Sequence, residues 1–535
     1  MSHFVQPLDV IPHAVFYAHE HLATLAPHIS ELQEVRTPTR AYAAVRRTLD
    51  NVQVLAQLGY DAPSPALNTY GFPGRFKPYQ HQTETFEFLT RHRKAFVLDD
   101  PGLGKTSATI WAVDFLRSAG RIGRVLVLCP LSCVKSVWQR ELFNILPNDS
   151  VALAIGSLEE KRVAIKSKAR WIIMNHDGVK PCAVDLIEDK SITHVIVDEA
   201  TAFKTYGRGR FRALRAVLGT TRTCWMLTGT PCPQGPWDAW ALCRLICPER
   251  VPSSLNGWND LTATKREVRA GAKTVAKWIA KPDSFKIVFG RMQPAIRHTK
   301  ADCLDLPDMI YVDRDAPLSA EQAKAEKEML KSFVADMAGG GQVVAQTAAA
   351  RLSKLLQIYQ GCVIQADGSI AELDWTPRMA ALLELIENSA SSVIVFAGFT
   401  GVVERLAREL PKHGHTAALI NGEVNPTDRD QIVQDFQAGR YKVLCAHPKA
   451  MAHGLTLTAA STSVWWGPYF AVETVLQANE RMSRPGQKHV MTIAHLVSGA
   501  SERRSYELVR TGTLTQAALL SLYAEATKQR GRRTP

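Results

Sequence analysis

The stretch that decides the fold is AFVLDDPGLGKT, residues 95–106. Its first four residues are apolar and predict a buried strand, and the glycine-rich loop that follows leads into a helix. At such a junction the backbone N–H groups and the positive end of the helix point at one place, where they can hold phosphate oxygens. Gly102 and Gly104 let the backbone approach a ligand, Lys105 can reach the β- and γ-phosphates, and the Thr106 hydroxyl can bind Mg²⁺.

The loop carries only part of the full phosphate-loop pattern G-x-x-x-x-G-K-[ST]. Asp99 occupies the position of the first glycine, so the G-x-G-K-T core remains, with Leu103 between the glycines. A simple glycine turn before a helix would explain the same residues. A second signal is therefore needed before the loop is assigned to nucleotide binding.

That signal is HVIVDEAT, residues 194–201, where two acids follow an apolar strand. The carboxyl ends of parallel strands share one edge of a sheet, which is where ligands bind. We expect Asp198 to face the Mg²⁺ held by Thr106, and Glu199 to orient or deprotonate an attacking water. Acids after a strand also serve as helix N-terminal charges, so this pair gains its weight from the loop.

Short apolar runs without alternation recur along the chain, as is typical of parallel strands buried on both faces. We predict strands at 95–98, 125–129, 171–174, 194–197 and 224–227, and again at 392–396, 417–420, 443–446, 463–466 and 492–497. The longer stretches between them supply crossover helices. The sequence therefore predicts an α/β protein with two tandem, doubly wound parallel-sheet lobes, at residues 76–245 and 376–510.

Three further segments complete the predicted domain organisation. Residues 1–75 form a small N-terminal accessory segment with a helix near 40–58. Residues 246–375 form a helical bridging region, in which 264–281 carries Lys and Arg at helical spacing and 318–337 is a polar helix. Residues 511–535 form a basic tail.

Composition limits the class of protein. The chain has 535 residues, 46% of them hydrophobic and 21% charged, and no apolar run long enough to span a bilayer. A net charge of +13 favours a polyanionic partner. The ten cysteines lack zinc-site spacing and are interpreted as reduced core thiols. These features predict a cytoplasmic protein without a membrane partner.

Taken in order, the motifs resemble those of superfamily-two helicases, and within them the SWI/SNF-type DNA translocases. The resemblance covers about residues 76–500 and rests on PYQ (78–80), DDPGLGKT (99–106), VLVLCPLS (125–132), DEAT (198–201), LTGTP (227–231), AIRHTK (295–300), GLTL (454–457) and QANERMSRPGQ (477–487). Trp138 and Glu141 fit the third of these motifs. The chain departs from the family at Thr201, at His298, which replaces an arginine, and at Thr456.

The resemblance implies two RecA-like lobes with ATP between them. It assigns adenine reading to Gln80 and nucleotide contact to Gln477, and it places Arg481 and Arg484, three apart on a helix, at the γ-phosphate. It also implies two further sets of residues. Those that couple hydrolysis to movement are Thr228, Gly229, Thr230 and Gly454, and those that contact the nucleic-acid backbone are Ser132, Lys135, Thr400 and Arg429.

We therefore predict an ATP- and Mg²⁺-dependent motor that tracks along DNA, with duplex DNA favoured and RNA an open alternative. A strand-separating or branch-migrating helicase is the second hypothesis, and an ATPase-dead scaffold, which the intact Lys105, Asp198, Glu199 and Arg484 argue against, is the third. The setting implied is a bacterial or phage-infected cell, and no protein partner is assigned. Weaker contact candidates, each equally consistent with a solvated surface, are Arg208, Arg210, Arg212, Arg215 and residues 264–281. Trp465 and Trp466 are candidates for base stacking, but they lie in an apolar strand, which favours a core role for at least one of them.

Overall fold

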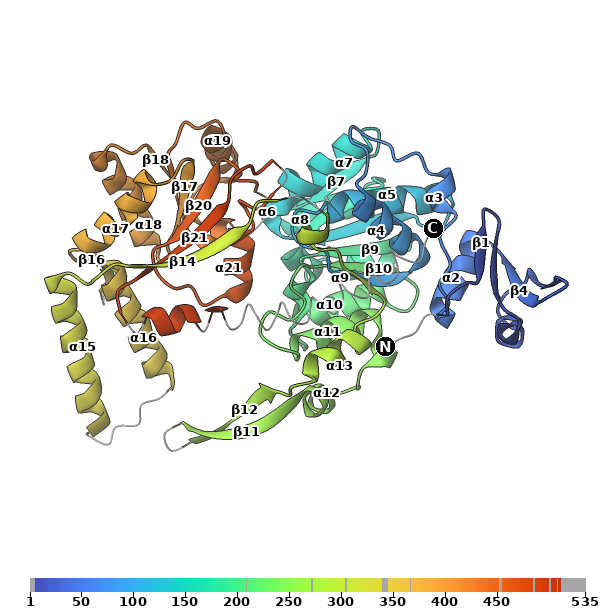
Figure 1. Ribbon diagram of the computed structural model, residues 1–535, viewed down its shortest axis with the longest axis horizontal. Coiled ribbons are helices and arrows are strands. Elements are labelled where there is room, and N and C mark those ends of the chain that lie inside the picture. The colour runs from blue at the N-terminus through green and yellow to red at the C-terminus, as the bar shows by residue number, and fades with distance from the viewer. Residues whose placement is uncertain are drawn as a thin grey trace. The chain divides into compact units, whose positions relative to one another are not determined.

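The computed structural model describes residues 5–207, 209–270, 273–303, 306–338, 345–365, 367–451, 455–484, 486–499, 502–507 and 509–510. Among these residues, two compact units form (Figure 1). The first holds the chain up to Ala263 together with Ala280–Cys303, and the second holds Thr264–Ile279 and the described chain from residue 306 onward. Each unit is built on one parallel sheet.

The sheet of the first unit has seven strands, all parallel to their neighbours. Their order is β13 (Ala295–Ile296), β5 (Lys94–Val97), β10 (Thr223–Leu227), β9 (Ile192–Asp198), β6 (Arg124–Cys129), β8 (Trp171–Asn175) and β7 (Val151–Ala154). The five strands predicted here are confirmed within one or two residues. The short β7 and β13 were not predicted.

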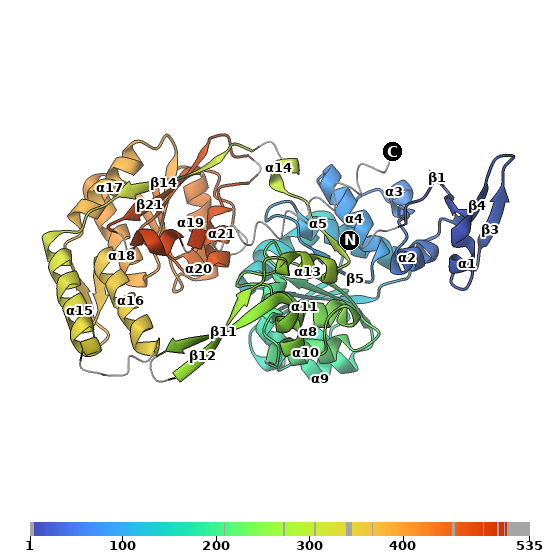
Figure 2. The same ribbon diagram turned by 60° about the horizontal axis from the view of Figure 1, so that its bottom comes forward.

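Successive residues of these strands enter different cores, because side chains alternate across a strand. On β5, Phe96 belongs to the core of one face, whereas Ala95 and Val97 belong to that of the other. One face is covered by α4 (Gln80–Arg91), α5 (Lys105–Ser118) and α7 (Arg140–Ile145), and the other by α9 (Ala183–Glu188), α10 (Gly209–Leu218) and α11 (Asp238–Ile246) (Figure 2). Burial on both faces explains why the strands are apolar throughout.

The second unit repeats this architecture with six parallel strands. Their order is β14 (Met309–Asp315), β21 (Met491–Val497), β20 (Ala460–Trp465), β17 (Ser392–Phe396), β19 (Val443–Ala446) and β18 (Ala417–Ile420). One face is covered by α17 (Thr376–Glu387) and α18 (Thr400–Glu409), and the other by α19 (Pro426–Gln437), α20 (Pro448–Met451) and α21 (Val472–Asn479). Two doubly wound α/β lobes are therefore confirmed.

Trp465 and Trp466 lie in the two different cores of this lobe. Their exposed fractions are 1% and 0%. The expectation that at least one of them is a core residue is confirmed; both are buried, and neither ring is available to stack on a base.

The predicted helical bridge at 246–375 is wrong in its first part. Residues 264–281 form β11 (Ala263–Ala270) and β12 (Lys273–Ala280), a two-stranded sheet. The Lys and Arg spacing misled the prediction, whereas the β-branched Thr264, Val268, Val275 and Ile279 favour extended backbone. The bridge also gives β13 and β14 to the two large sheets, so it does not form a unit of its own.

The second part of the bridge is helical as predicted. The polar helix expected at 318–337 is α15 (Ala320–Ala338). The remaining elements of the region are α12 (Leu255–Thr262), α13 (Ser284–Arg291), α14 (Lys300–Cys303), α16 (Ala345–Gln360), β15 (Cys362–Ile364) and β16 (Ile370–Glu372).

The N-terminal segment forms an antiparallel sheet with its own small core. The order is β1 (Asp9–Ile11), β2 (Ala14–Ala18), β4 (Ala41–Arg46) and β3 (Leu32–Arg36), and α2 (Leu49–Leu58) packs on it. The helix predicted at 40–58 is wrong in its first half, because β4 pairs with two neighbours and the helix starts only after the cap at Thr48. Tertiary pairing overrides local propensity here.

This accessory sheet is fastened to the first lobe through the far end of α4. Arg91 Nη1 lies 2.6 Å from Asp61 Oδ1, and the Ser64 backbone N–H donates to Glu87 Oε1 at 2.8 Å. Arg91 and Glu87 are both largely buried. The accessory segment is therefore anchored to the same helix that begins at Gln80.

Among the described residues no helix is long and apolar enough to cross a membrane. All ten cysteines are free thiols, and all except Cys303 are buried. Within the same residues no group of three or more His, Cys, Asp and Glu side chains is placed to hold a metal ion. The cysteines thus act as small core residues, as their scattered positions predicted.

In the second unit a buried ion pair ties α17 to the chain that follows β21. Arg378 Nη2 contacts Glu502 Oε2, and the two side chains are 1% and 0% exposed. The Ser498 backbone N–H also donates to Glu502 Oε2, at 2.7 Å, and Arg378 Nη2 donates to the Leu496 carbonyl at 3.3 Å. Each charge compensates the other in a site without solvent.

We expect Arg378→Met to lower the free energy of unfolding by about 3–5 kcal/mol, because Glu502 would stay buried without its cation. The double variant R378M/E502L removes both charges and should recover most of that loss. Urea unfolding of the full chain, followed by tryptophan fluorescence, measures both. Equal losses in the single and double variants would show that the ion pair is not the cause.

Candidate nucleotide-binding site

The loop between β5 and α5 has the backbone that phosphate binding requires. Gly102 and Gly104 have φ values of 94° and 77°, in the left-handed region that favours glycine. Gly104 is the N-cap of α5, so the helix begins at Lys105 with the N–H groups of its first turn unused by the helix itself. Leu103 is buried beneath the loop. The predicted strand–loop–helix junction is present.

Lys105 lies within this loop. Its ammonium donates to the carbonyls of Asp99, at 2.8 Å, and Asp100, at 3.2 Å. Burial lowers the pKa of Lys105, while the carboxylates of Asp99, Glu199, Asp198 and Asp100 oppose that shift. The acid pair at the end of β9 is therefore close enough to the loop to act on its lysine.

Asp198 is held in one orientation by its neighbours. The buried Trp138 donates its indole N–H to Asp198 Oδ2 at 2.9 Å, and the Glu199 backbone N–H donates to Oδ1 at 3.0 Å. His176 Nε2 donates to the Asp198 carbonyl at 2.8 Å. Sequence reasoning placed Trp138 in a motif without finding this contact, and it missed His176.

The site has the oxygen ligands that Mg²⁺ prefers. Thr106 offers a hydroxyl in the first turn of α5. Asp198 is the last residue of β9 and offers a carboxylate at the carboxyl end of that strand. Glu199 has a φ of 49°, which is uncommon for a residue other than glycine. This strained backbone turns the chain sharply after β9, at the position of the predicted general base.

Of the four predicted coupling residues, Gly229 packs against the phosphate loop, and Thr228 is hydrogen-bonded to the strand that precedes the loop. The Thr228 backbone N–H donates to the Val97 carbonyl at 3.0 Å, and the Thr230 N–H donates to Thr228 Oγ1 at 3.1 Å. A Cβ atom at Gly229 would lie 3.0 Å from Pro101 Cδ, so glycine permits this close approach. The fourth, Gly454, lies outside the described residues.

The first turn of α4 also contacts the loop. His81 Nε2 and Gln82 Nε2 both donate to the Leu103 carbonyl, at 2.9 and 3.2 Å. Gln80, the predicted adenine reader, is exposed and donates to Glu84 Oε1 at 3.0 Å. Sequence reasoning found Gln80 but not the two residues that follow it.

The segment after β13 braces the two aspartates of the loop. Arg297 Nη2 donates to Asp100 Oδ1 at 2.6 Å, and the Lys300 backbone N–H donates to Asp100 Oδ2 at 2.9 Å. The His298 backbone N–H donates to Asp99 Oδ1 at 2.8 Å. Burial would raise the pKa of Asp99, but His298 and Lys105 bring it below its ordinary value. The residue that replaces the first glycine is thus part of the loop's support.

In the second unit the predicted arginines are not on a helix. α21 ends at Asn479, so Gln477 is helical and buried while Arg481 and Arg484 follow in turns. Pro485 follows Arg484 in the sequence and disfavours helical backbone at Arg484 itself. Arg481 is 3% exposed and donates from Nη1 to the Leu455 carbonyl at 3.4 Å, whereas Arg484 is half-buried.

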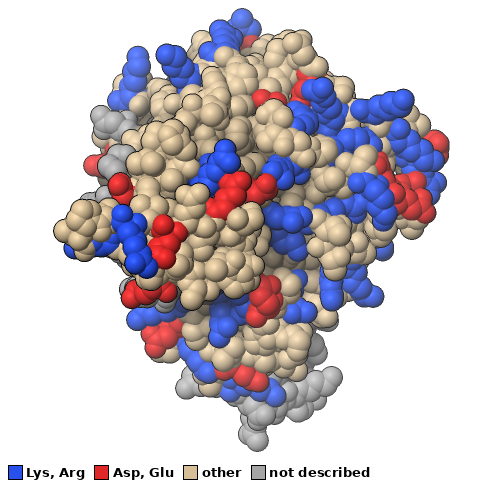
Figure 3. Space-filling model, turned by 90° about the vertical axis from the view of Figure 1, so that its right-hand side faces the viewer, with Lys and Arg blue, Asp and Glu red and all other residues tan. Residues whose placement is uncertain are grey.

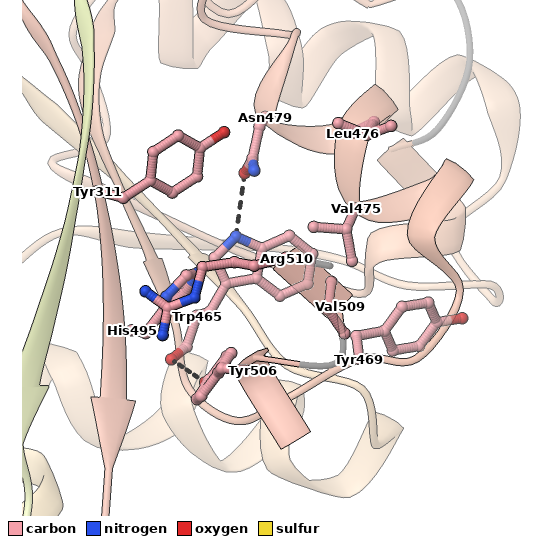
Figure 4. Close-up of a pocket in the computed structure, with 10 residues that line it drawn as sticks. All are labelled: Tyr311, Trp465, Tyr469, Val475, Leu476, Asn479, His495, Tyr506, Val509 and Arg510. Carbon is pink, nitrogen blue, oxygen red and sulfur yellow. Dashed lines mark hydrogen bonds between the residues drawn. The ribbon is translucent and has the colours of Figure 1, made fainter. Parts of the chain in front are cut away.

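A cavity of about 230 Å³ lies beside α21 (Figure 4). Trp465 crosses it and donates its indole N–H to Asn479 Oδ1 at 3.0 Å, while Tyr506 donates its hydroxyl to the Trp465 carbonyl at 3.1 Å. Further along, Gln487 Nε2 donates to the Ala460 carbonyl at 2.8 Å. The bonds of Asn479 and Gln487 attach both ends of the segment that contains Arg481 and Arg484 to β20.

The predicted backbone-contact residues are accessible in their own units. Ser132 and Lys135 are exposed just after β6, and Thr400 is exposed at the start of α18. Arg429 is half-buried and donates from Nη2 to the Val424 carbonyl at 3.2 Å.

Two of the weaker basic candidates, Arg210 and Arg212, are engaged within the protein. Arg210 Nε donates to Asp177 Oδ1 at 2.6 Å and Arg212 Nε donates to the Gly207 carbonyl at 2.7 Å, while Arg208 lies outside the described residues. Figure 3 shows lysine and arginine side chains spread over one face with acidic groups among them, and not as one continuous patch.

Comparison with known families agrees with this site. The SNF2-related domain family matches residues 79–364, which is more than half of the 535-residue chain, and the helicase conserved C-terminal domain matches residues 377–486. The chain belongs to the SNF2-related family. It thus carries the two domains of the ATP-dependent helicase type, and its two lobes are RecA-like.

Several relatives of this SNF2-related chain are similar over most of its length. It is 26% identical to YwqA of Bacillus subtilis, an ATP-dependent helicase/translocase by name, over 85% of this chain and 48% of YwqA. It is 26% identical to protein p41 of Acyrthosiphon pisum secondary endosymbiont phage 1, over 85% of this chain and 99% of p41. It is 24% identical to the yeast ISWI chromatin-remodeling complex ATPase ISW1, over 80% of this chain and 39% of ISW1.

The chain therefore spans less than half of two of these relatives and nearly all of the phage protein. Among solved structures, it is similar to the Sulfolobus solfataricus SWI2/SNF2 ATPase core in complex with dsDNA. The identity is 22%, the match covers 85% of this chain and 96% of that chain, and the TM-score is 0.38.

We expect Trp138→Phe to lower kcat for ATP hydrolysis by roughly tenfold, because Asp198 loses a charge-assisted hydrogen bond that fixes its orientation. Trp171→Phe is the matched control, since this buried tryptophan also donates to a carboxylate, Asp149 Oδ2 at 2.8 Å, away from the loop. Steady-state ATPase assays on both variants test this. An equal loss of kcat in both would contradict a specific role for Trp138.

Proposed function

We propose that this chain is an ATP-hydrolysing motor that moves along duplex DNA. The observation that carries the proposal is the half-buried Lys105 in a left-handed glycine loop, close to the oriented Asp198, in a chain of the SNF2-related family. A glycine turn that only caps a helix would not need a lysine held against the loop carbonyls and within electrostatic reach of the acid pair.

Each predicted site residue of the first unit has a proposed role in hydrolysis. The N–H groups of the loop from Gly102 to Thr106 bind the phosphates, and Lys105 neutralises their charge. Thr106 and Asp198 hold Mg²⁺, which when bound offsets charge on the phosphate oxygens. Glu199 orients the attacking water or accepts its proton. Gln80 recognises the adenine ring.

Residues of the second unit are proposed to complete the reaction. Arg481 and Arg484 supply positive charge to the γ-phosphate during transfer, and Gln477 contacts the nucleotide. The close approach of Gly229 to Pro101 of the loop supports a coupling role for Thr228, Gly229 and Thr230, because a change in the loop would act on this segment. Gly454 is proposed for the same role by its motif alone.

Duplex DNA is the proposed track for two reasons. The net charge of +13 favours a polyanion, and relatives bear names such as ATP-dependent DNA helicase DDM1, which is 24% identical over 75% of this chain. Binding through Ser132, Lys135, Thr400 and Arg429 would be mainly to phosphates, and so insensitive to sequence and sensitive to salt. A strand-separating helicase is the second candidate, because several relatives are named helicases.

We expect duplex DNA to stimulate ATP hydrolysis more than single-stranded DNA or RNA does, and Lys105→Ala to abolish hydrolysis with every nucleic acid. The chain should displace the third strand of a triplex in an ATP-dependent reaction without separating a plain duplex. ATPase assays with each nucleic acid, run beside the two displacement assays, decide the matter. Duplex unwinding would favour the helicase, and stimulation by RNA alone would overturn the choice of track.

We expect Lys135→Ala to weaken duplex binding by a similar factor for all sequences, and to reduce the slope of log K against log salt concentration by about one. Lys190→Ala is the control, because Lys190 is equally exposed but precedes β9, at the opposite edge of the parallel sheet. Fluorescence anisotropy over a salt series measures both slopes. An unchanged slope in the Lys135 variant would show that Lys135 does not contact the DNA phosphates.

A further inference from the structure

A continuous line of polar contacts runs from the first residue of α4 to the lysine of the phosphate loop. Gln80 Nε2 donates to Glu84 Oε1 at 3.0 Å, and Glu84 Oε2 lies 2.8 Å from His298 Nε2. His298 Nδ1 lies 3.0 Å from Asp99 Oδ1, and the Asp99 carbonyl accepts from Lys105 Nζ at 2.8 Å. Three segments that are distant in the sequence are joined in this way.

His298 is the centre of this line. Its side chain is 7% exposed and lies between two carboxylates, one on each ring nitrogen. A carboxylate accepts hydrogen bonds, so both ring nitrogens must carry a proton for both contacts to form. Only the imidazolium form satisfies Glu84 and Asp99 together, and a neutral ring would leave one of them facing a lone pair.

Asp99 is fixed by other contacts as well. It is 1% exposed, its Oδ1 accepts from the His298 backbone N–H at 2.8 Å, and its Oδ2 accepts from Thr85 Oγ1 at 3.0 Å. A buried carboxylate with these fixed partners cannot shift without breaking several bonds. A displacement of the His298 ring would therefore change the position of the loop, through Asp99, and of α4, through Glu84.

We propose that His298 is a positioning residue that links adenine recognition at Gln80 to the conformation of the phosphate loop. This inference rests on the proposed roles of Gln80 and Lys105. Adenine at Gln80 would compete for the side-chain amide that donates to Glu84. Glu84 contacts the imidazolium of His298, and that imidazolium contacts Asp99. The chain would thus favour ATP over a nucleotide whose base lacks the 6-amino group, such as GTP, by more than the direct contact to the base.

The link from Gln80 to the loop should depend on pH, because it requires the charged form of His298. Burial would lower the pKa of His298, but Asp99 and Glu84 raise it to about 9. The cation is therefore present at neutral pH and is lost as the pH rises through about 9. The groups around it on α4, the loop, α5 and the segment after β13 are His81, Glu84, Asp99, Asp100, Lys105, Arg297, Lys300 and Cys303.

The test compares His298→Gln with His298→Arg. Glutamine has no charge, whereas arginine carries a permanent charge and several donors. We expect H298Q to lower kcat/KM for ATP about tenfold, the size of one charge-assisted hydrogen bond, with little change for GTP. H298R should restore the preference for ATP. His194→Gln is the control, because this fully buried histidine bonds Thr223 and does not touch the loop.

Equilibrium binding of ATP and GTP, measured from pH 7 to 10, provides the second readout. The wild-type chain should lose its preference for ATP as the pH passes about 9, and H298R should keep it, which separates His298 from the titration of Lys105. If His298 acted on stability alone, H298Q would lower the affinity for both nucleotides equally and would leave the preference for ATP unchanged at every pH.

The outcomes separate this inference from the proposed function. If the wild-type chain prefers ATP and H298Q keeps the same preference, the link through His298 is wrong while the motor stands. If the wild-type chain neither binds nor hydrolyses ATP, or if Lys105→Ala is fully active, the proposed function fails and this inference fails with it.

Discussion

The carboxylates of the phosphate loop are the constraint on which the nucleotide site depends. Asp99 is buried and Asp100 is half-buried, and each needs a partner because a charge removed from water without one is costly. The partners are Arg297, His298 and the Lys300 backbone, which lie 197 to 200 residues further along the chain. The loop is thus held by the segment that directly precedes the second unit in the sequence, and not by its own strand and helix alone.

Much of the fold follows from the sequence because buried parallel strands leave an unmistakable pattern. In strands such as β17 and β19 every position except Ser392 is apolar, since both of their faces are covered. β14 was missed because it is mostly exposed, and β13 because it has only two residues. The two-stranded sheet of β11 and β12 was missed because its charges imitate helical spacing, whereas pairing between strands decides the structure.

The candidate site shows the same division. Lys105, Thr106, Asp198 and Glu199 could be predicted because local motifs carry them, and the structure brings the loop and the acid pair into electrostatic contact. Trp138 on Asp198 and His298 on Asp99 could not be predicted, because these contacts join residues 60 and 199 positions apart. Two departures were the available signal: Asp99 departs from the general phosphate-loop pattern and His298 departs from the family motif, and the structure shows that their side chains contact each other.

The same contacts give a physical reason for the proposed arginines of the second unit. During phosphoryl transfer, negative charge shifts on the phosphate oxygens and must be met by cations. Near the loop, Arg297 is engaged by Asp100 and the Leu98 carbonyl, and His298 is engaged by Asp99 and Glu84. Releasing either would leave a buried carboxylate without its partner, so these cations serve the loop and not the phosphate. Lys105 and the Mg²⁺ proposed at Thr106 and Asp198 can meet part of the charge, and cations from elsewhere in the chain can meet more of it, which is the role proposed for Arg481 and Arg484.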